Sequence, residues 1–109
     1  LLSLGVNANS VGFGTVVGTK IYDFQNENYI RIYLSVDSED STHSNSSCVI
    51  GGHIVANINL ANHEEVTVNR MLSVALAAQM AGKKVRIHSG STSATDCEVD
   101  FIAIQETYF

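Results

Sequence analysis

The 109-residue chain contains no proline and no tryptophan, and it has few cations, with six Lys plus Arg against eleven Asp plus Glu. The resulting net charge of −5 argues against a general nucleic-acid binder, because such proteins draw their affinity largely from neutralising phosphates. No apolar run approaches the ~20 residues that a membrane-spanning helix needs. The length fits one domain with a single core. We therefore expect one folded domain that neither binds nucleic acid nor spans a membrane.

The sequence also lacks the residue patterns of an enzyme or a metal site. The four histidines are scattered without metal-ligand spacing: His43, His53, His63 and His88. The glycines of 12–18 lie within an expected strand that no helix follows, so they do not form a phosphate-binding loop. The acidic residues of 96–100 alternate along another expected strand, which is typical of a solvated edge. We therefore expect a non-enzymatic protein without a cofactor or a metal.

Two features favour export of the protein from the cell. The apolar N-terminus ends in Val6-Asn7-Ala8, which has small residues at the positions that a signal peptidase reads. Residues 1–12 are therefore interpreted as a signal-peptide remnant, with an ordinary first strand or a disordered terminus as the alternatives, and residues 13–109 as the domain. Two cysteines without a CxxC motif favour one structural disulfide over a redox or zinc site, and buried free thiols are the alternative.

Alternation of apolar and polar residues predicts five strands. They are expected at 13–24, 29–36, 48–60, 85–88 and 97–105. The first strand should bend or bulge at its glycines and pair with the second through a short loop at 25–28. Residues 37–47 contain no apolar side chain, so they are expected to form a solvated loop. In the third strand, Ile50 should face the same way as Ile54 and Ile58.

The stretch 62–89 predicts one helix followed by a strand. Asn62 and Glu65 have the spacing of a capping box, and Gly82 suits the left-handed position just past a helix end, so the helix should run between these positions. Its polar stripe is narrow, and the rest of its surface is apolar. A chain of this length cannot bury such a helix on all sides, so we expect one side to pack on the domain and the other on a second chain. The residues expected at that contact are Met71, Leu72, Val74, Leu76 and Met80.

The expected order of three strands, one helix and two strands is that of the OB-fold, a mainly β, five-stranded Greek-key barrel with its helix between strands three and four. In this barrel the third and fifth strands lie parallel near the closure. Cys48 and Cys97 begin those two strands, so they should be close enough to form a disulfide. The bond would close a loop of roughly 50 residues and contribute up to ~4 kcal/mol in the chain-entropy model.

Two segments resemble a known family. The segment 72–88, with its helical LSVALAAQM, the Gly82 stop and the strand Val85-Arg86-Ile87-His88, resembles the helix–Gly–strand passage of the B subunits of pertussis-like and subtilase-type AB5 toxins. The hairpin at 19–34 is similar to theirs, with a strand, a short polar turn and a Tyr-led second strand. The resemblance implies an OB-fold homopentamer whose helices line a central channel. It also implies binding to host cell-surface glycans, which are often sialylated, and an enzymatic A subunit as partner. With it comes the expectation of secretion from a bacterial cell through the periplasm.

The chain departs from the family pattern at two points. Those subunits have a serine on the first strand that contacts sialic acid, whereas the aligned position here is Gly14, with Thr15 next to it. Their additional disulfide and their Trp-containing segments are missing, since this chain has two cysteines and no Trp. Glycan specificity therefore has to be argued from other residues.

The candidate glycan site is the outer face of the first expected hairpin. Tyrosine rings stack on the apolar face of a sugar, and Arg31 or Lys20 could hold a carboxylate such as that of sialic acid. The candidate residues are Thr15, Lys20, Tyr22, Tyr29, Arg31, Tyr33 and Ser35. Ordinary cross-strand pairing, or burial of this face at a subunit interface, is the alternative interpretation. The hydroxyl-rich loop 89–96 is a second candidate, since loops of this kind flank the binding face of OB-folds.

The sequence thus favours a non-enzymatic, secreted glycan-binding B subunit of an AB5-type toxin. The alternative is an exported oligomeric OB-fold protein that binds a protein target, as an inhibitor or an adhesin.

Overall fold

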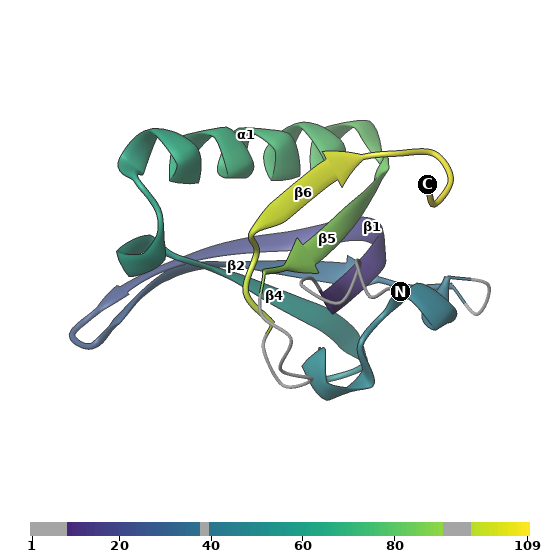
Figure 1. Cartoon of the computed structure of the whole chain (residues 1–109), viewed down its shortest axis with the longest axis horizontal. Coiled ribbons are helices and arrows are strands. Elements are labelled where there is room, and N and C mark those ends of the chain that lie inside the picture. Colours follow the sequence, from purple (N-terminus) through teal and green to yellow (C-terminus); the bar gives the residue numbers. More distant parts are fainter. Residues whose placement is uncertain (1–8, 38–39, 91–96) are drawn as a thin grey trace, which may run out of the picture.

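The computed structural model describes residues 9–37, 40–90 and 97–109. These residues form a six-stranded antiparallel sheet with one α-helix, so the chain is mainly β as predicted (Figure 1). The strands are β1 (Asn9–Phe24), β2 (Glu27–Ser35), β3 (Val49–Ile50), β4 (His53–Asn59), β5 (Lys84–Ser89) and β6 (Phe101–Ile104). The helix α1 (Glu65–Ala81) lies between β4 and β5 in the chain. The strands are ordered β3-β4-β2-β1-β5-β6 across the sheet.

The long β1 strand organises the sheet, because its first half pairs with β5 and its second half with β2. Its register shifts between Ser10 and Gly12 and again between Val16 and Gly18, so the predicted irregularity at the glycines is present. The strand begins at Asn9 rather than at residue 13, and residues 9–12 of the expected N-terminal segment therefore belong to the sheet. Residues 1–8, which include the predicted cleavage motif, lie outside the described residues.

The β1–β2 hairpin is the longest feature of the fold, and its tip projects beyond the first turn of α1 at the left of Figure 1. Two residues connect the strands, and the second of them, Asn26, has a positive φ of 71°. Asparagine tolerates this conformation better than most residues. The predicted hairpin is therefore confirmed, with a turn shorter than the expected 25–28 loop.

The predicted third strand is divided into β3 and β4, which gives six strands instead of five. Gly51 and Gly52 have φ values of 62° and 84°, and two successive positive φ angles make a tight hairpin turn instead of continuing a strand. Ile50 therefore pairs with His53 across this turn and is 55% exposed, whereas Ile54 and Ile58 are buried. The expectation that Ile50 shares their buried face is wrong.

The end of the chain returns to β4 before it enters β6. The Asn57 amide donates to the Cys97 carbonyl, and the Val99 amide donates to the Asn57 carbonyl, both at 2.9 Å. These bonds make a parallel bridge, so the expected parallel approach of the third and last strands is present at this point. The predicted disulfide is also present: Cys48 and Cys97 are bonded, with their Cα atoms 5.8 Å apart. Only Phe101–Ile104 of the expected strand 97–105 forms β6.

The helix ends as predicted but begins differently. Gly82 adopts the left-handed conformation, with φ of 68°, and the Lys83 amide donates to the Ala78 carbonyl as in a Schellman motif. At the other end the helix starts at Glu65 after Glu64, which makes no side-chain cap. The predicted capping box is wrong because the N-cap position is Glu64, two residues after Asn62. The Asn62 side chain instead donates to a Glu98 carboxylate oxygen, a contact made by tertiary folding.

One core lies between α1 and the inner face of the sheet. The helix contributes its buried residues Val68, Met71, Ala75 and Ala78. The sheet contributes Val11, Val16, Ile30, Ile32, Leu34, Ile54, Ala56, Ile58, Val85 and Ile87. No helix among the described residues is long and apolar enough to cross a membrane.

The residues expected at an oligomer contact divide between the two sides of the helix. Met71 belongs to the core, and Leu72 is partly buried against it. Val74 is half-buried. Leu76 is 41% exposed and Met80 is 90% exposed. The helix α1 therefore does expose apolar side chains on the side away from the core, but this surface is narrower than predicted.

Candidate functional site

The outer face of the β1–β2 hairpin gathers five of the predicted site residues. Because successive strand residues point to opposite faces, Ile30 and Ile32 enter the core and their neighbours on β2 point outward. The register places Lys20 opposite Arg31, Tyr22 opposite Tyr29, and Gly18 opposite Tyr33. We call Lys20, Tyr22, Tyr29, Arg31 and Tyr33 the aromatic–cation face.

Two tyrosine rings form the centre of the aromatic–cation face. Tyr22 and Tyr29 stack with centroids 4.6 Å apart and an interplanar angle of 21°. Phe24 meets Tyr22 edge to face at 6.2 Å and is 67% exposed, so it extends the aromatic surface to the hairpin tip. Phe24 was not among the predicted site residues, although its two-residue spacing from Tyr22 along β1 places both side chains on the same face of the strand.

Arg31 is held by its neighbours on three sides. Its Nε donates to Asn57 Oδ1 on β4 at 2.9 Å, and its Nη2 is 3.4 Å from the Tyr29 hydroxyl, to which it donates. Its guanidinium carbon lies 5.4 Å from the Tyr22 ring centroid and 5.2 Å from that of Tyr29. Burial opposes the charge of this partly buried group, but a hydrogen bond to Tyr33 and the neighbouring tyrosines outweigh it and raise the Arg31 pKa. Arg31 therefore braces the tyrosine pair against β4.

Lys20 is the exposed cation of the aromatic–cation face. Its Nζ lies 4.9 Å from the centroid of the Tyr33 ring. Within the described residues, neither Lys20 nor Arg31 forms a salt bridge with a carboxylate. Like charges directly opposite on paired strands normally destabilise a sheet. An unneutralised cation pair in a chain of net charge −5 is thus a local positive site that suits an anionic group.

The pKa values of the Tyr22 and Tyr33 hydroxyls are shifted in opposite directions. Burial raises the pKa of Tyr33, but hydrogen bonds with Arg31, Tyr22 and Lys20 outweigh it and leave the pKa below its ordinary value. The hydrogen bond to Tyr33 raises the pKa of Tyr22.

A pocket of about 410 Å³ adjoins Tyr29 near the hairpin tip. We call it the amide pocket; its lining residues are Asn26, Asn28, Tyr29, Asn59, Leu60 and Ala61. Side-chain amides both donate and accept hydrogen bonds, as sugar hydroxyls do. The ring of Tyr29 and the amides beside it can therefore contact the apolar and polar sides of one sugar.

Thr15 and Ser35 fall outside the aromatic–cation face. They pair with each other across the strands, but on the far side of the register shift between Val16 and Gly18. A Cβ atom at Gly14 would lie 2.4 Å from the Ser35 carbonyl oxygen. No side chain fits there without backbone movement, so a serine cannot replace Gly14 in this structure.

The second predicted site is the loop 89–96. Ser89 is buried, and the Gly90 amide donates to Asp100 Oδ2 at 2.6 Å. Residues 91–96 lie outside the described residues.

In the loop expected to be solvated at 37–47, the described residues 40–47 form more regular structure than their composition suggested. It contains the 3₁₀ turns Ser41–His43 and Ser46–Cys48, and Asp40 is buried with a salt bridge of 2.7 Å to Lys84 Nζ. The burial of Asp40 could not be predicted from the local sequence, because its partner Lys84 lies 44 positions away in the chain.

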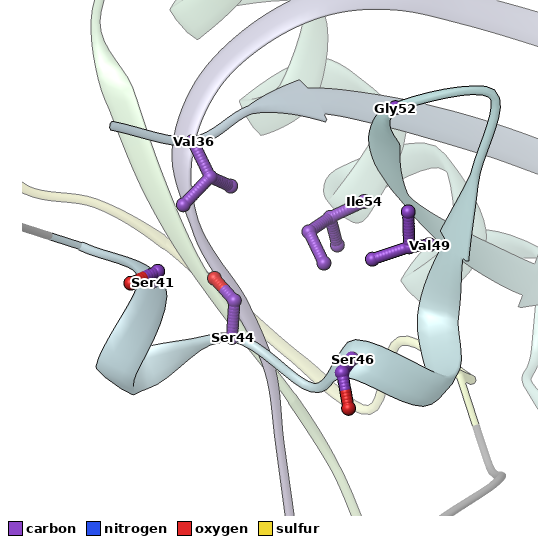
Figure 2. Close-up of a pocket in the computed structure, with 7 residues that line it drawn as sticks. All are labelled: Val36, Ser41, Ser44, Ser46, Val49, Gly52 and Ile54. Atoms are coloured by element: carbon purple, nitrogen blue, oxygen red, sulfur yellow. The ribbon is translucent and has the colours of Figure 1, made fainter. Parts of the chain in front are cut away.

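A pocket of about 200 Å³ beside this loop is a second concave site. Serines lie along one side of the pocket and apolar side chains along the other (Figure 2). The lining residues are Val36, Ser41, Ser44, Ser46, Val49, Gly52 and Ile54. Ser44 is engaged within the fold, since it accepts from the Phe13 amide at 3.3 Å and its hydroxyl is 3.4 Å from the Asp40 carbonyl. No charged group or ring lines this pocket, so the aromatic–cation face is the stronger candidate.

Neither metal chemistry nor a known relative adds to this assignment. Among the described residues, no three His, Cys, Asp or Glu side chains gather as metal ligands would. The chain matches no protein-family model, and no curated protein or solved structure is significantly similar to it.

Proposed function

We propose that the chain is a glycan-binding protein that holds sugars on the aromatic–cation face. The observation that carries the proposal is the stacked, partly exposed Tyr22–Tyr29 pair beside two cations without carboxylate partners among the described residues. Aromatic rings cover the apolar face of a sugar, and phenol, amide and guanidinium groups bond to its hydroxyls. The amide pocket at Tyr29 offers the same combination.

The fold we propose for this site is an OB-fold with a divided third strand. In support, β1 pairs with both β2 and β5, β2 pairs with β4, and the segment before β6 returns to β4 through a parallel bridge. The helix between β4 and β5 agrees with the same plan. OB-folds present binding surfaces on their strands and on the loops beside them, which is consistent with a site on the hairpin.

We further propose that the protein is the B subunit of an AB5-type toxin, secreted and assembled as a homopentamer with an enzymatic A subunit. The exposed Leu76 and Met80 on α1 support a contact with a second chain, because such side chains gain from burial. The disulfide supports an extracellular or periplasmic location.

A second candidate function is recognition of a protein target by an exported oligomer. Phe24 and Ile21 are both largely exposed near the hairpin tip, and aromatic residues with Arg dominate the strongly contributing positions of protein interfaces.

A glycan array with the purified protein separates the two candidates. Sugar binding that is lost in Tyr22→Ala and kept in Phe109→Ala, which removes an exposed ring elsewhere, supports the first. No binding to any glycan contradicts it and favours the second.

A further inference from the structure

We propose that a pocket between α1 and the inner face of the β1–β2 hairpin binds a small cation with an apolar body, namely an alkylamine. This inference goes beyond the proposed glycan binding, which concerns the outer face of the same hairpin. The pocket has a volume of about 420 Å³ and is called here the helix–hairpin pocket. Pockets that bind small molecules usually measure roughly 300–1,000 Å³, so this one has a suitable size.

The helix–hairpin pocket exists because the hairpin extends further than the helix that covers it. The hairpin tip projects beyond the first turn of α1 (Figure 1). Ile21 and Ile30 pair across the two strands, so their side chains share the inner face of the sheet. Ile30 is only 4% exposed, whereas Ile21 is 69% exposed. Ile21 is therefore a side chain on the core face that the helix leaves uncovered.

One face of α1 forms the opposite wall of the pocket. Glu65, Val68, Asn69 and Leu72 line it, and their i, i+3, i+4, i+7 spacing places them along one side of the helix. All the apolar side chains of the lining are aliphatic, and none is aromatic: Ile21, Ile30, Leu60, Val68 and Leu72. An alkyl chain bound here would leave water for aliphatic contacts with the helix and with the hairpin.

The polar groups of the pocket can all accept hydrogen bonds. Glu65 is exposed, and no described cation forms a salt bridge with it. His63 Nε2 is buried 3.2 Å from Asp100 Oδ1, although the angle is not that of a good hydrogen bond. A nitrogen lone pair would be repelled by the carboxylate at this distance, so in the neutral ring Nε2 carries the proton and Nδ1 is the acceptor. Asn69 adds an amide oxygen, and an ammonium group has three donors for these acceptors.

The charge of the pocket favours an amine over other ligands with the same apolar body. The lining contains the Glu65 carboxylate and no Lys or Arg, in a chain of net charge −5. The positive end of the helix dipole would attract an anion, but the Glu65 carboxylate already lies in the first turn. A fatty acid would therefore be repelled by Glu65, and an alcohol would gain the apolar contacts alone. An alkylammonium ion gains these contacts and a charge-assisted hydrogen bond.

The test is an NMR titration of the ¹⁵N-labelled protein with three probes that share an alkyl chain: octylamine, 1-octanol and octanoate. We expect octylamine to bind at least tenfold more tightly than 1-octanol, and octanoate to bind more weakly than the alcohol. The largest amide shifts should occur at Ile21, at Ile30 and at 60–72.

Two variants separate the charge of the pocket from its apolar wall. Glu65→Gln should lower the affinity for octylamine at least threefold and leave that for 1-octanol unchanged. Ile21→Ala should lower both affinities about threefold, because it shortens the apolar wall. Glu106→Gln is the matched control, since it makes the same change of charge at an exposed residue after β6, and it should bind like the wild type.

Two results would overturn the inference. Equal affinities for octylamine and 1-octanol, unchanged in Glu65→Gln, would show that the pocket does not select a cation. Shifts that do not saturate, or that are the same in Ile21→Ala, would show that the amine binds elsewhere on the acidic surface. Neither result touches the proposed glycan binding, which the glycan array tests separately. Thermal unfolding confirms that each variant is folded, and Glu65→Asp, which keeps a carboxylate, should keep the preference for the amine.

Discussion

The brace between Arg31 and Asn57 should be measurable as a coupling free energy. Arg31→Lys keeps the positive charge but removes the Nε donor that bonds Asn57 Oδ1 at 2.9 Å and the Nη2 donor that lies 3.4 Å from the Tyr29 hydroxyl. The first bond has good geometry and the second is long. A hydrogen bond to a charged group contributes about 1.5–3 kcal/mol, and the partial exposure of Arg31 reduces this. We therefore expect Arg31→Lys to cost about 1–2 kcal/mol of unfolding free energy.

A double-mutant cycle isolates this interaction. The free energy of unfolding is measured in urea for the wild type, Arg31→Lys, Asn57→Ala and the double variant, with Arg70→Lys on the exposed side of α1 as the matched control. We expect a coupling free energy of about 1 kcal/mol between the two positions and no loss of stability in the control. Additivity within about 0.3 kcal/mol would show that the bond contributes nothing to stability, and would remove Arg31 as the positioning residue of the tyrosine pair.

Three further predictions concern the disulfide, the half-buried His88 and the helix. Replacing Cys48 and Cys97 by serine reopens a loop with a sequence separation of 49, so urea denaturation should show a loss of about 4 kcal/mol; a loss under 1 kcal/mol would contradict the chain-entropy estimate. Burial, and secondly the charge of Arg86, lower the pKa of His88 below its ordinary 6.5. The imidazole of His88 therefore binds a proton more tightly in the unfolded chain than in the folded chain. Above pH 6.5 His88 should not affect the free energy of unfolding, and as the pH falls below 6.5 it should lower that free energy. The decline in unfolding free energy between pH 7 and pH 5 should be shallower in His88→Gln, and an unchanged slope would refute this. Met80→Asp should lower the native mass in solution while each chain keeps its fold by circular dichroism, because the Met80 side chain is 90% exposed in one chain. A wild type that is already monomeric would contradict the proposed assembly.

Local signals in the sequence were sufficient for much of the fold. The two-residue alternation around Tyr29 to Tyr33 predicts which side chains leave the core, and the hairpin turn then places Lys20 opposite Arg31. Gly82 stops the helix through its own backbone conformation, which needs no distant partner. The disulfide was predictable because strand order and cysteine spacing agreed.

The parts that were missed depend on distant partners or on successive glycines. Asn62 has the right spacing for a cap but bonds to Glu98, 36 positions away. Asp40 looks like a solvated loop residue until Lys84 approaches it. The Gly51–Gly52 pair reads as part of a strand, yet both residues take positive φ and reverse the chain.

The central claim is that sugars bind on the aromatic–cation face, and NMR titration of the ¹⁵N-labelled protein with 3′-sialyllactose tests it most directly. The account predicts that the backbone amides whose shifts change most lie at 18–24 of β1 and 29–33 of β2. Changes concentrated at 41–54 without the hairpin would assign the sugar to the serine-lined pocket of Figure 2 and contradict the claim. The absence of any change at millimolar ligand would contradict it as well.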